Sequence, residues 1–226
     1  TGYHDGETST SQLIEAIDWA EDENANPDSP YYQKIDTGKV AVMGMSCGGL
    51  QALEASLDPR VTTSIIWNSG VFGQRPATGD QPGGTPGAAP GEGPSAITPG
   101  ETPGGTTQGA AAPAGDRVAA PSGVRMPTID FSKNDLQRLH APILYITGTK
   151  DIALENAKDD FSRITKVPVF LAVKNGAEHH DATYQKPNAG DYGVYGTAWL
   201  KWHLKGDKGA ASVFEGKDCT LCKDAG

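Results

Sequence analysis

Cysteine, aromatic residues and long apolar runs are all scarce in this chain of 226 residues. No apolar run approaches the ~20 residues that a membrane-spanning helix needs, so we expect no membrane span. Basic residues are fewer than acidic ones, 19 against 28, and the net charge of −9 argues against nucleic acid or an anionic membrane as a partner. No signal peptide is visible, but the first residues resemble the middle of a protein, so a removed signal is not excluded. The length suits one globular domain.

The three cysteines are Cys47, Cys219 and Cys222. A zinc half-site at Cys219 and Cys222 would need a second pair of ligands, which the sequence does not offer. A thioredoxin-type redox pair would stand at the start of a helix after a strand, whereas this pair lies in a polar tail. We therefore favour a disulfide between Cys219 and Cys222 in a secreted, extracellular protein. It would close a very short loop and stabilise the fold little.

Large aliphatic residues are almost missing from one long internal segment, residues 76–121. Ile97 and Val118 are its only aliphatic side chains larger than alanine, and Gly, Pro, Ala and Thr dominate the rest. Such a composition cannot bury enough apolar area to offset the entropy of ordering the chain. We predict a disordered insertion here. The alternative, a lid over a binding site, would need an apolar underside.

The rest of the chain alternates between strand and helix patterns. Strands are predicted at 39–43, 61–67, 142–147 and 167–173, and helices at 8–22, 47–57, 131–140, 152–164 and 194–204. This alternation predicts an α/β fold, a mainly parallel sheet covered by helices on both faces, built from residues 1–75 and 122–226. In the helix at 152–164 the predicted inner face is Ala153, Ala157, Phe161 and Ile164.

The most informative motif is Gly44-Met45-Ser46-Cys47-Gly48, which follows a strand pattern and opens a helix pattern. A Gly-x-Ser-x-Gly sequence in this context is typical of a nucleophile elbow, a tight turn that exposes the serine at the edge of a sheet. We expect side chains at Gly44 or Gly48 to collide with the neighbouring backbone. The bland alternative is a glycine-rich loop.

A serine nucleophile needs a base, and the base needs a carboxylate that orients it. Asp151 follows the third predicted strand, and the pair His179 and His180 follows the fourth. Ser, Asp and His thus occur in the order of an α/β-hydrolase triad, at carboxyl ends of strands. Taken singly, Asp151 could be a helix cap, and the two histidines a solvated pair or a weak metal site.

Three segments together resemble the dienelactone hydrolase-like branch of the α/β hydrolases, which includes cutinase-like and polyester-hydrolase-like enzymes. They are residues 44–49, 151–153 and 180–184. The resemblance implies Ser46 as nucleophile, Asp151 as orienting acid and a histidine as base. It also implies the Cys47 N–H as an oxyanion donor and carboxylic esters, such as polyester or cutin-like chains, as substrates. No metal or organic cofactor is implied. We further expect Phe72 and Tyr184 to line the substrate site, with ordinary core packing as the alternative for each.

The sequence leaves two candidates for the base. Alignment on the downstream Thr183-Tyr184 selects His180, whereas alignment without a gap from Asn175-Gly176 selects His179. We prefer His180, because the downstream residues that select it lie closer to the two histidines and offer more matching positions.

Measured against that family, the first strands of the sheet and the loop with the second oxyanion donor are not in this sequence. We expect a further segment or a second chain to complete the sheet. Two other functions stay open at this point: a non-catalytic binding domain of the same fold, and a peptidase or amidase with the same triad.

Overall fold

A computed structural model describes residues 8–72, 129–180 and 186–223 of the chain. Their centre is a sheet of four parallel strands in the order β1-β2-β3-β4. The strands are β1 (Val40–Met45), β2 (Val61–Trp67), β3 (Ile143–Gly148) and β4 (Val169–Lys174). The predicted α/β architecture is therefore confirmed, and all four predicted strands are present. The predicted insertion at 76–121 lies outside the described residues.

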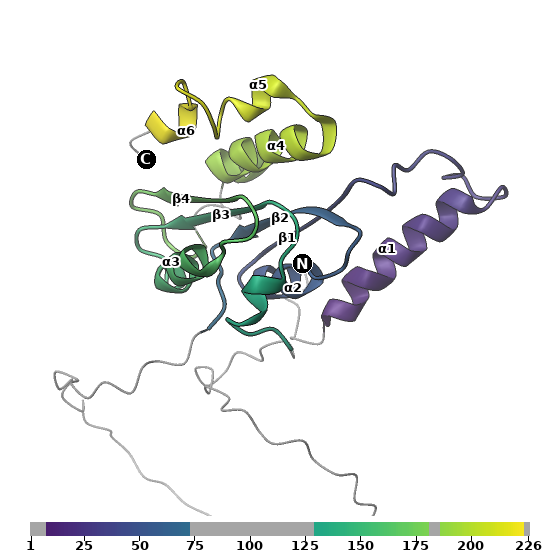
Figure 1. Ribbon diagram of the computed structural model, residues 1–226, viewed down its shortest axis with the longest axis horizontal. Helices are drawn as coiled ribbons and strands as arrows, with labels where there is room; N and C mark the ends of the chain where they lie inside the picture. Colours follow the sequence, from purple (N-terminus) through teal and green to yellow (C-terminus); the bar gives the residue numbers. More distant parts are fainter. Residues whose placement is uncertain (1–7, 73–128, 181–185, 224–226) are drawn as a thin grey trace, which may run out of the picture. The chain divides into compact units, whose positions relative to one another are not determined.

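Helices cover both faces of this sheet (Figure 1). One face packs against α2 (Cys47–Ala55) and α3 (Leu154–Arg163), with α1 (Thr10–Ala25) against α2. The other face packs against α4 (Gly190–Lys205), followed by the short helices α5 (Lys208–Ala211) and α6 (Thr220–Lys223). Two 3-10 turns, η1 (Asp135–Arg138) and η2 (Pro187–Ala189), complete the described elements. None of the helices in this described part is long and apolar enough to cross a membrane.

Two apolar cores result from the alternation of side chains along the buried strands. In β2, Ile66 belongs to the core under α2 and α3, whereas its neighbour Ile65 belongs to the core under α4. In β3, Tyr145 and Leu144 divide in the same way. Both faces of the two strands are buried, and the buried side chains of β2 include the polar Thr63 and Ser64 as well as its isoleucines.

The predicted helices are present apart from the one at 131–140, but α1 ends at Ala25, beyond the predicted 8–22, and α4 begins at Gly190, four residues before the predicted 194–204. Helix α1 begins after Ser9, whose N–H donates to Gln12 Oε1 at 3.1 Å as one half of a capping box. The helix predicted at 131–140 is only the 3-10 turn η1. Phe161, predicted on the inner face of α3, is 40 % exposed, and the neighbouring Asp160 is buried instead.

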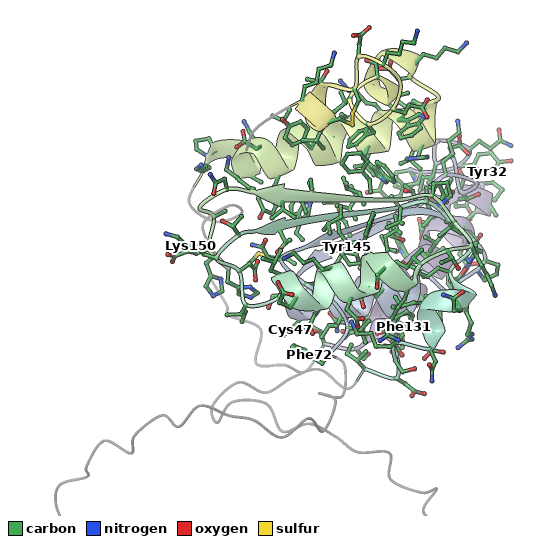
Figure 2. All side chains as sticks on the ribbon, turned by 60° about the vertical axis from the view of Figure 1, so that its left-hand side comes forward. Tyr32, Cys47, Phe72, Phe131, Tyr145 and Lys150 are labelled. Carbon is green, nitrogen blue, oxygen red and sulfur yellow. A yellow bond between two sulfur atoms is a disulfide. The ribbon has the colours of Figure 1, made fainter. Side chains whose placement is uncertain are left out.

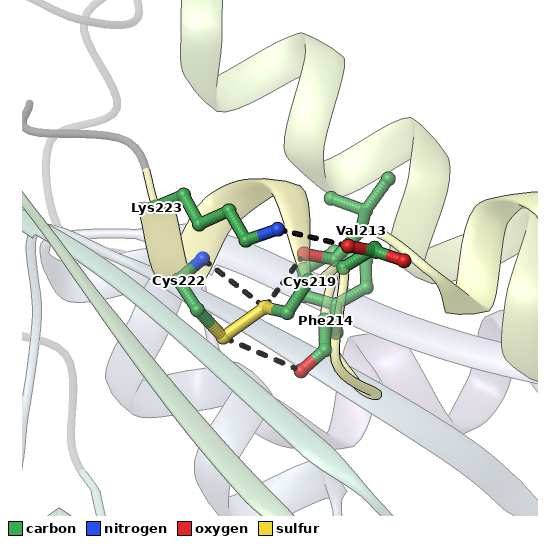
Figure 3. The surroundings of a disulfide bond; sticks show 6 residues. Val213, Phe214, Cys219, Cys222 and Lys223 are labelled. Atoms are coloured by element: carbon green, nitrogen blue, oxygen red, sulfur yellow. Dashed lines mark hydrogen bonds and ion pairs between the residues drawn. A yellow bond between two sulfur atoms is a disulfide. The ribbon is translucent and has the colours of Figure 1, made fainter.

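The carboxyl-terminal part of the chain packs onto α4, and a disulfide between Cys219 and Cys222 closes a short loop within it (Figure 3). Aromatic rings join it to the sheet: Phe214 packs edge-on against Trp199 of α4 and against Phe170 of β4. The Cys222 N–H lies 3.1 Å from Cys219 Sγ. The tail is therefore a part of the packed fold, where the sequence indicated only a polar end.

Candidate active site

All four strands are parallel, so their carboxyl ends meet at one edge of the sheet, and the predicted site residues follow these ends. Ser46 comes directly after β1, Asp151 three residues after β3, and His179 five residues after β4. Lys150, the residue before Asp151, marks this edge in Figure 2. The topology thus brings together residues that are up to 133 positions apart in the chain.

Ser46 stands in a strained turn between β1 and α2. Its φ of 54° lies in the left-handed region that side chains other than glycine rarely adopt. The Ser46 N–H donates to the Trp67 carbonyl oxygen at 3.1 Å, and the Ser46 carbonyl accepts from the Ser69 hydroxyl at 2.8 Å. The end of β2 therefore holds the main chain of Ser46 from both sides.

Two glycines make this turn possible, but only one of them is a glycine that the sequence singled out. A Cβ at Gly44 would lie 2.1 Å from the Gly48 carbonyl oxygen, as predicted. A Cβ at Gly48 would meet nothing within 4 Å, so the predicted collision there was wrong. The second close approach is at Gly49, where a Cβ would lie 2.5 Å from the Ser69 Cβ.

His179 lies between Ser46 and Asp151 and contacts both. Its Nε2 is 2.9 Å from Ser46 Oγ, and its Nδ1 is 2.9 Å from Asp151 Oδ1. An ionised carboxylate only accepts hydrogen bonds, so the Nδ1 proton belongs on the side of Asp151. In the neutral ring Nε2 then accepts from the serine hydroxyl. This is the arrangement that general-base activation of a serine requires.

The preference for His180 as the residue between Ser46 and Asp151 was therefore wrong. The ring of His180 packs edge-on against that of His179, with centroids 4.8 Å apart. The turn at Gly176 that leads to His179 is hydrogen-bonded to the loop before Asp151: the Gly176 N–H donates to Thr149 Oγ1 at 2.8 Å, and the Lys150 N–H donates to the Ala177 carbonyl oxygen at 3.0 Å. The ungapped count from this turn, the less favoured of the two sequence alignments, selects His179, the histidine that contacts Ser46 and Asp151.

The Asp151 carboxylate is buried and bonded from two directions. Its Oδ1 accepts from the Ala153 N–H at 2.8 Å as well as from His179 Nδ1. Asp151 therefore holds the turn before α3 and also contacts His179, but it is not the helix cap that the sequence offered as an alternative, because the N-cap of α3 is Ala153. Burial acts to raise the pKa of Asp151, but the hydrogen bonds from His179 and Ala153 outweigh it and hold that pKa below its ordinary range.

The remaining predicted residues have different positions. Cys47 is the first residue of α2, directly after Ser46, where helix N–H groups favour negative charge. Phe72 is 59 % exposed, and Tyr184 lies outside the described residues. The disulfide of Cys219 and Cys222 belongs to the layer of α4 to α6, on the face of the sheet opposite α2.

Sequence reasoning missed Asn68 and Ser69, which follow β2 and bond the main chains of His179 and Ser46. Asparagine and serine after a strand are common turn residues, so nothing in the sequence marked them. Within 8–72, 129–180 and 186–223, no three His, Cys, Asp or Glu side chains converge as a metal site.

Comparisons with known proteins find similarity in structure but not in sequence. No protein-family model matches the chain, and no curated protein matches it in sequence. A structure described as a putative dienelactone hydrolase from Klebsiella pneumoniae is similar over 84 % of this chain and 59 % of its own, with 13 % identity and a TM-score of 0.47. A SOBER1 variant from Arabidopsis thaliana is similar over 86 % of this chain and 63 % of its own, with 14 % identity and a TM-score of 0.46. The chain thus spans less than two thirds of the length of either structure.

Proposed function

We propose that this protein is a serine hydrolase in which Ser46, His179 and Asp151 act as a catalytic triad. The observation that carries the proposal is the unbroken chain of two contacts, each 2.9 Å long, from Ser46 Oγ through the His179 ring to Asp151 Oδ1. The left-handed φ of Ser46 supports it, because strain of this kind is typical of functional positions.

The proposed reaction is acyl transfer from an ester to water. Ser46 Oγ attacks the carbonyl carbon while its proton passes to His179 Nε2, and Asp151 stabilises the charged ring. The Cys47 N–H at the start of α2 helps to hold the oxyanion. Collapse of the tetrahedral intermediate releases the alcohol, which takes the proton from His179. Water then attacks the acyl group, gives a proton to His179 and releases the acid, and the proton returns to Ser46.

Carboxylic esters are the substrate class that the sequence resemblance suggests, with polyester or cutin-like chains as a finer proposal. The half-exposed ring of Phe72, from the loop after β2, would offer an apolar contact for such a substrate. Tyr184 is a second proposed lining residue. In the same resemblance, the second oxyanion donor and the strands beyond β1 would come from a further segment or chain. A secreted location fits the disulfide of Cys219 and Cys222, since disulfides persist in oxidising compartments.

The test of this function compares matched substrates on the full chain. We expect turnover of p-nitrophenyl acetate and butyrate, weaker turnover of the matching anilides, and a loss of about 10⁴-fold or more in the Ser46→Ala variant. Soluble products released from a polyester film would support the finer proposal. Faster turnover of anilides than of esters would make the protein an amidase. Equal rates for the wild type and Ser46→Ala would contradict a serine hydrolase and favour a binding domain.

A further inference from the structure

The segment that follows β2 touches the main chains of both Ser46 and His179. Trp67 and Ser69 bond the main chain of Ser46, as described above. Between them, Asn68 turns the other way, and its Nδ2 donates to the His179 carbonyl oxygen at 2.6 Å. Three consecutive residues therefore join the proposed nucleophile to the proposed base.

Asn68 is held in a single orientation by its surroundings. It is completely buried, and its φ of 45° lies in the left-handed region, which asparagine tolerates better than most residues. A carbonyl oxygen only accepts, so the Asn68 amide nitrogen must face His179, and Oδ1 must face the other way. There it accepts from the Tyr192 hydroxyl of α4 at 2.7 Å. The His179 carbonyl therefore fixes which way the amide faces, and the Tyr192 hydroxyl holds its other end in place.

The loop that carries His179 is fixed on its other side to the loop that carries Asp151. The Lys150 N–H donates to the Ala177 carbonyl oxygen at 3.0 Å, and a Cβ at Gly148 would lie 2.1 Å from that same oxygen. These contacts set the position of His179 relative to Asp151. They do not set the position of His179 relative to Ser46. That position depends on the contacts beside β2, where Asn68 lies.

We propose that Asn68, held by Tyr192, is a positioning residue that sets the distance between His179 Nε2 and Ser46 Oγ. This inference rests on the proposed serine-hydrolase function. The bond from Asn68 acts on the main chain of His179, so its loss would displace the whole residue and lengthen the contact between Nε2 and Ser46 Oγ. A displacement of about 1 Å in such a site costs on the order of 100-fold in rate.

Two substitutions test the role of Asn68 without straining its backbone. Asn68→Gly keeps the left-handed conformation and removes the amide, and Asn68→Asp keeps the shape and replaces the donor by an acceptor. We expect each variant to lower kcat for p-nitrophenyl acetate by about 10- to 100-fold with little change in KM, because substrate contacts are untouched. Crystal structures of both variants should show the contact between Nε2 and Oγ longer than about 3.5 Å.

Thr63→Val is the matched control. Thr63 lies in β2, the strand that Asn68 follows, is equally buried, and accepts a hydrogen bond from Trp199 of α4 at 2.7 Å, as Asn68 does from Tyr192. We expect the kcat of Thr63→Val to stay within about twofold of the wild type. Thr63 lies near the start of β2, away from the carboxyl end of the strand where Ser46 and His179 are held. Tyr192→Phe should lower kcat less than Asn68→Gly, and the double variant should equal Asn68→Gly, since both changes act through one contact.

Unchanged kcat and an unchanged Nε2–Oγ distance in the folded Asn68 variants would overturn the positioning role. So would an equal fall in kcat in Thr63→Val, because the loss would then reflect general weakening of the packing between β2 and α4. If the wild type turns over no ester, the proposed function fails, and the crystal structures still decide the inference: a displaced His179 supports it and an unmoved one overturns it.

Discussion

Two buried aspartates near α3 have similar burial and opposite electrostatic behaviour. Asp151 precedes the helix and Asp160 lies within it, and the side chains of both are fully buried. Hydrogen bonds hold the pKa of Asp151 below its ordinary range. Burial raises the pKa of Asp160 to about 6, although the ion pair with Lys133 opposes that rise. Burial alone therefore does not identify a functional carboxylate, because the partners decide what the charge does.

The partners of Asp160 indicate a structural role. Its Oδ2 accepts from the Val71 N–H at 2.8 Å and lies 3.3 Å from the Tyr145 hydroxyl, and its Oδ1 lies 2.6 Å from Lys133 Nζ. Val71 and Lys133 stand on either side of residues 73–128 in the sequence, so Asp160 fastens two distant chain segments to α3. Asp151 instead bonds a histidine whose other nitrogen reaches a serine. The comparison predicts that substitution of Asp151 lowers mainly turnover, whereas substitution of Asp160 lowers mainly the free energy of unfolding.

The largest expected difference is in turnover. Asp151→Asn should lower kcat for an ester by about 10⁴-fold, because the amide favours the wrong tautomer of His179. Asp160→Asn should change kcat by less than about threefold. Steady-state kinetics with p-nitrophenyl acetate measure both values. Equal losses in the two variants would erase the distinction between a catalytic and a structural aspartate.

The second difference is in the free energy of unfolding, and here the order is reversed. Asp160→Ala should lower it by about 3 kcal/mol, because Lys133 loses a buried partner and the Val71 N–H becomes unsatisfied. Asp151→Ala should cost about 1 kcal/mol, since it leaves the Ala153 N–H without its acceptor. Urea unfolding monitored by circular dichroism gives both numbers. A larger loss in Asp151→Ala would contradict the assignment.

The pH dependence of stability should also have opposite signs for the two groups. The pKa of Asp160 is raised from an ordinary 3.8 to about 6, so its contribution is full below about pH 4 and is lost as the pH rises through about 6. The change amounts to about 3 kcal/mol. The pKa of Asp151 is lowered, so its contribution is present above about pH 4 and is lost as the pH falls through the folded pKa.

Urea unfolding from pH 3 to pH 7 measures these slopes. Asp160→Asn should remove a decline in stability between about pH 4 and pH 6. Asp151→Asn should remove a decline below about pH 4. An unchanged profile in Asp160→Asn would mean that this carboxyl group is ionised as easily in the folded protein as in the unfolded one.

The smallest expected effect is at Phe161, the neighbour of Asp160 in α3. Its ring is 40 % exposed, so Phe161→Ala should lower the free energy of unfolding by less than about 1 kcal/mol. A loss as large as that in Asp160→Ala would restore the inner-face position that the sequence predicted for Phe161. The same unfolding series provides this value.

The sequence predicted the architecture well because strand and helix patterns here are local. The run Val61–Trp67 reads as a buried strand and is one, and the glycine at position 44 identifies the turn that exposes Ser46. The positions of Ser and Asp followed from the rule that parallel strands bring their carboxyl ends to one edge. The position of Cys219 and Cys222 in a polar tail, without further metal ligands, predicted the disulfide between them.

What the sequence could not give are contacts between elements. Gly49 is required because Ser69, twenty positions later, packs against it, and Asp160 is buried because Lys133 reaches it. A helical pattern assigns Phe161 to the inner face, since apolar residues bury themselves by default, and it cannot foresee an ion pair that buries the aspartate beside it. The choice between His179 and His180 is likewise visible only in contacts between elements, since His179 lies between Ser46 of the turn after β1 and Asp151 of the loop after β3.

The most direct test of the central claim is labelling of the purified chain with a fluorophosphonate, located by peptide mass spectrometry. His179 and His180 are adjacent, so His180→Ala is a closely matched control for His179→Ala. We predict a label on Ser46 in the wild type and in His180→Ala, no label in Ser46→Ala, and labelling at least about 100-fold slower in His179→Ala. Labelling that survives in His179→Ala and is lost in His180→Ala would contradict the triad of Ser46, His179 and Asp151.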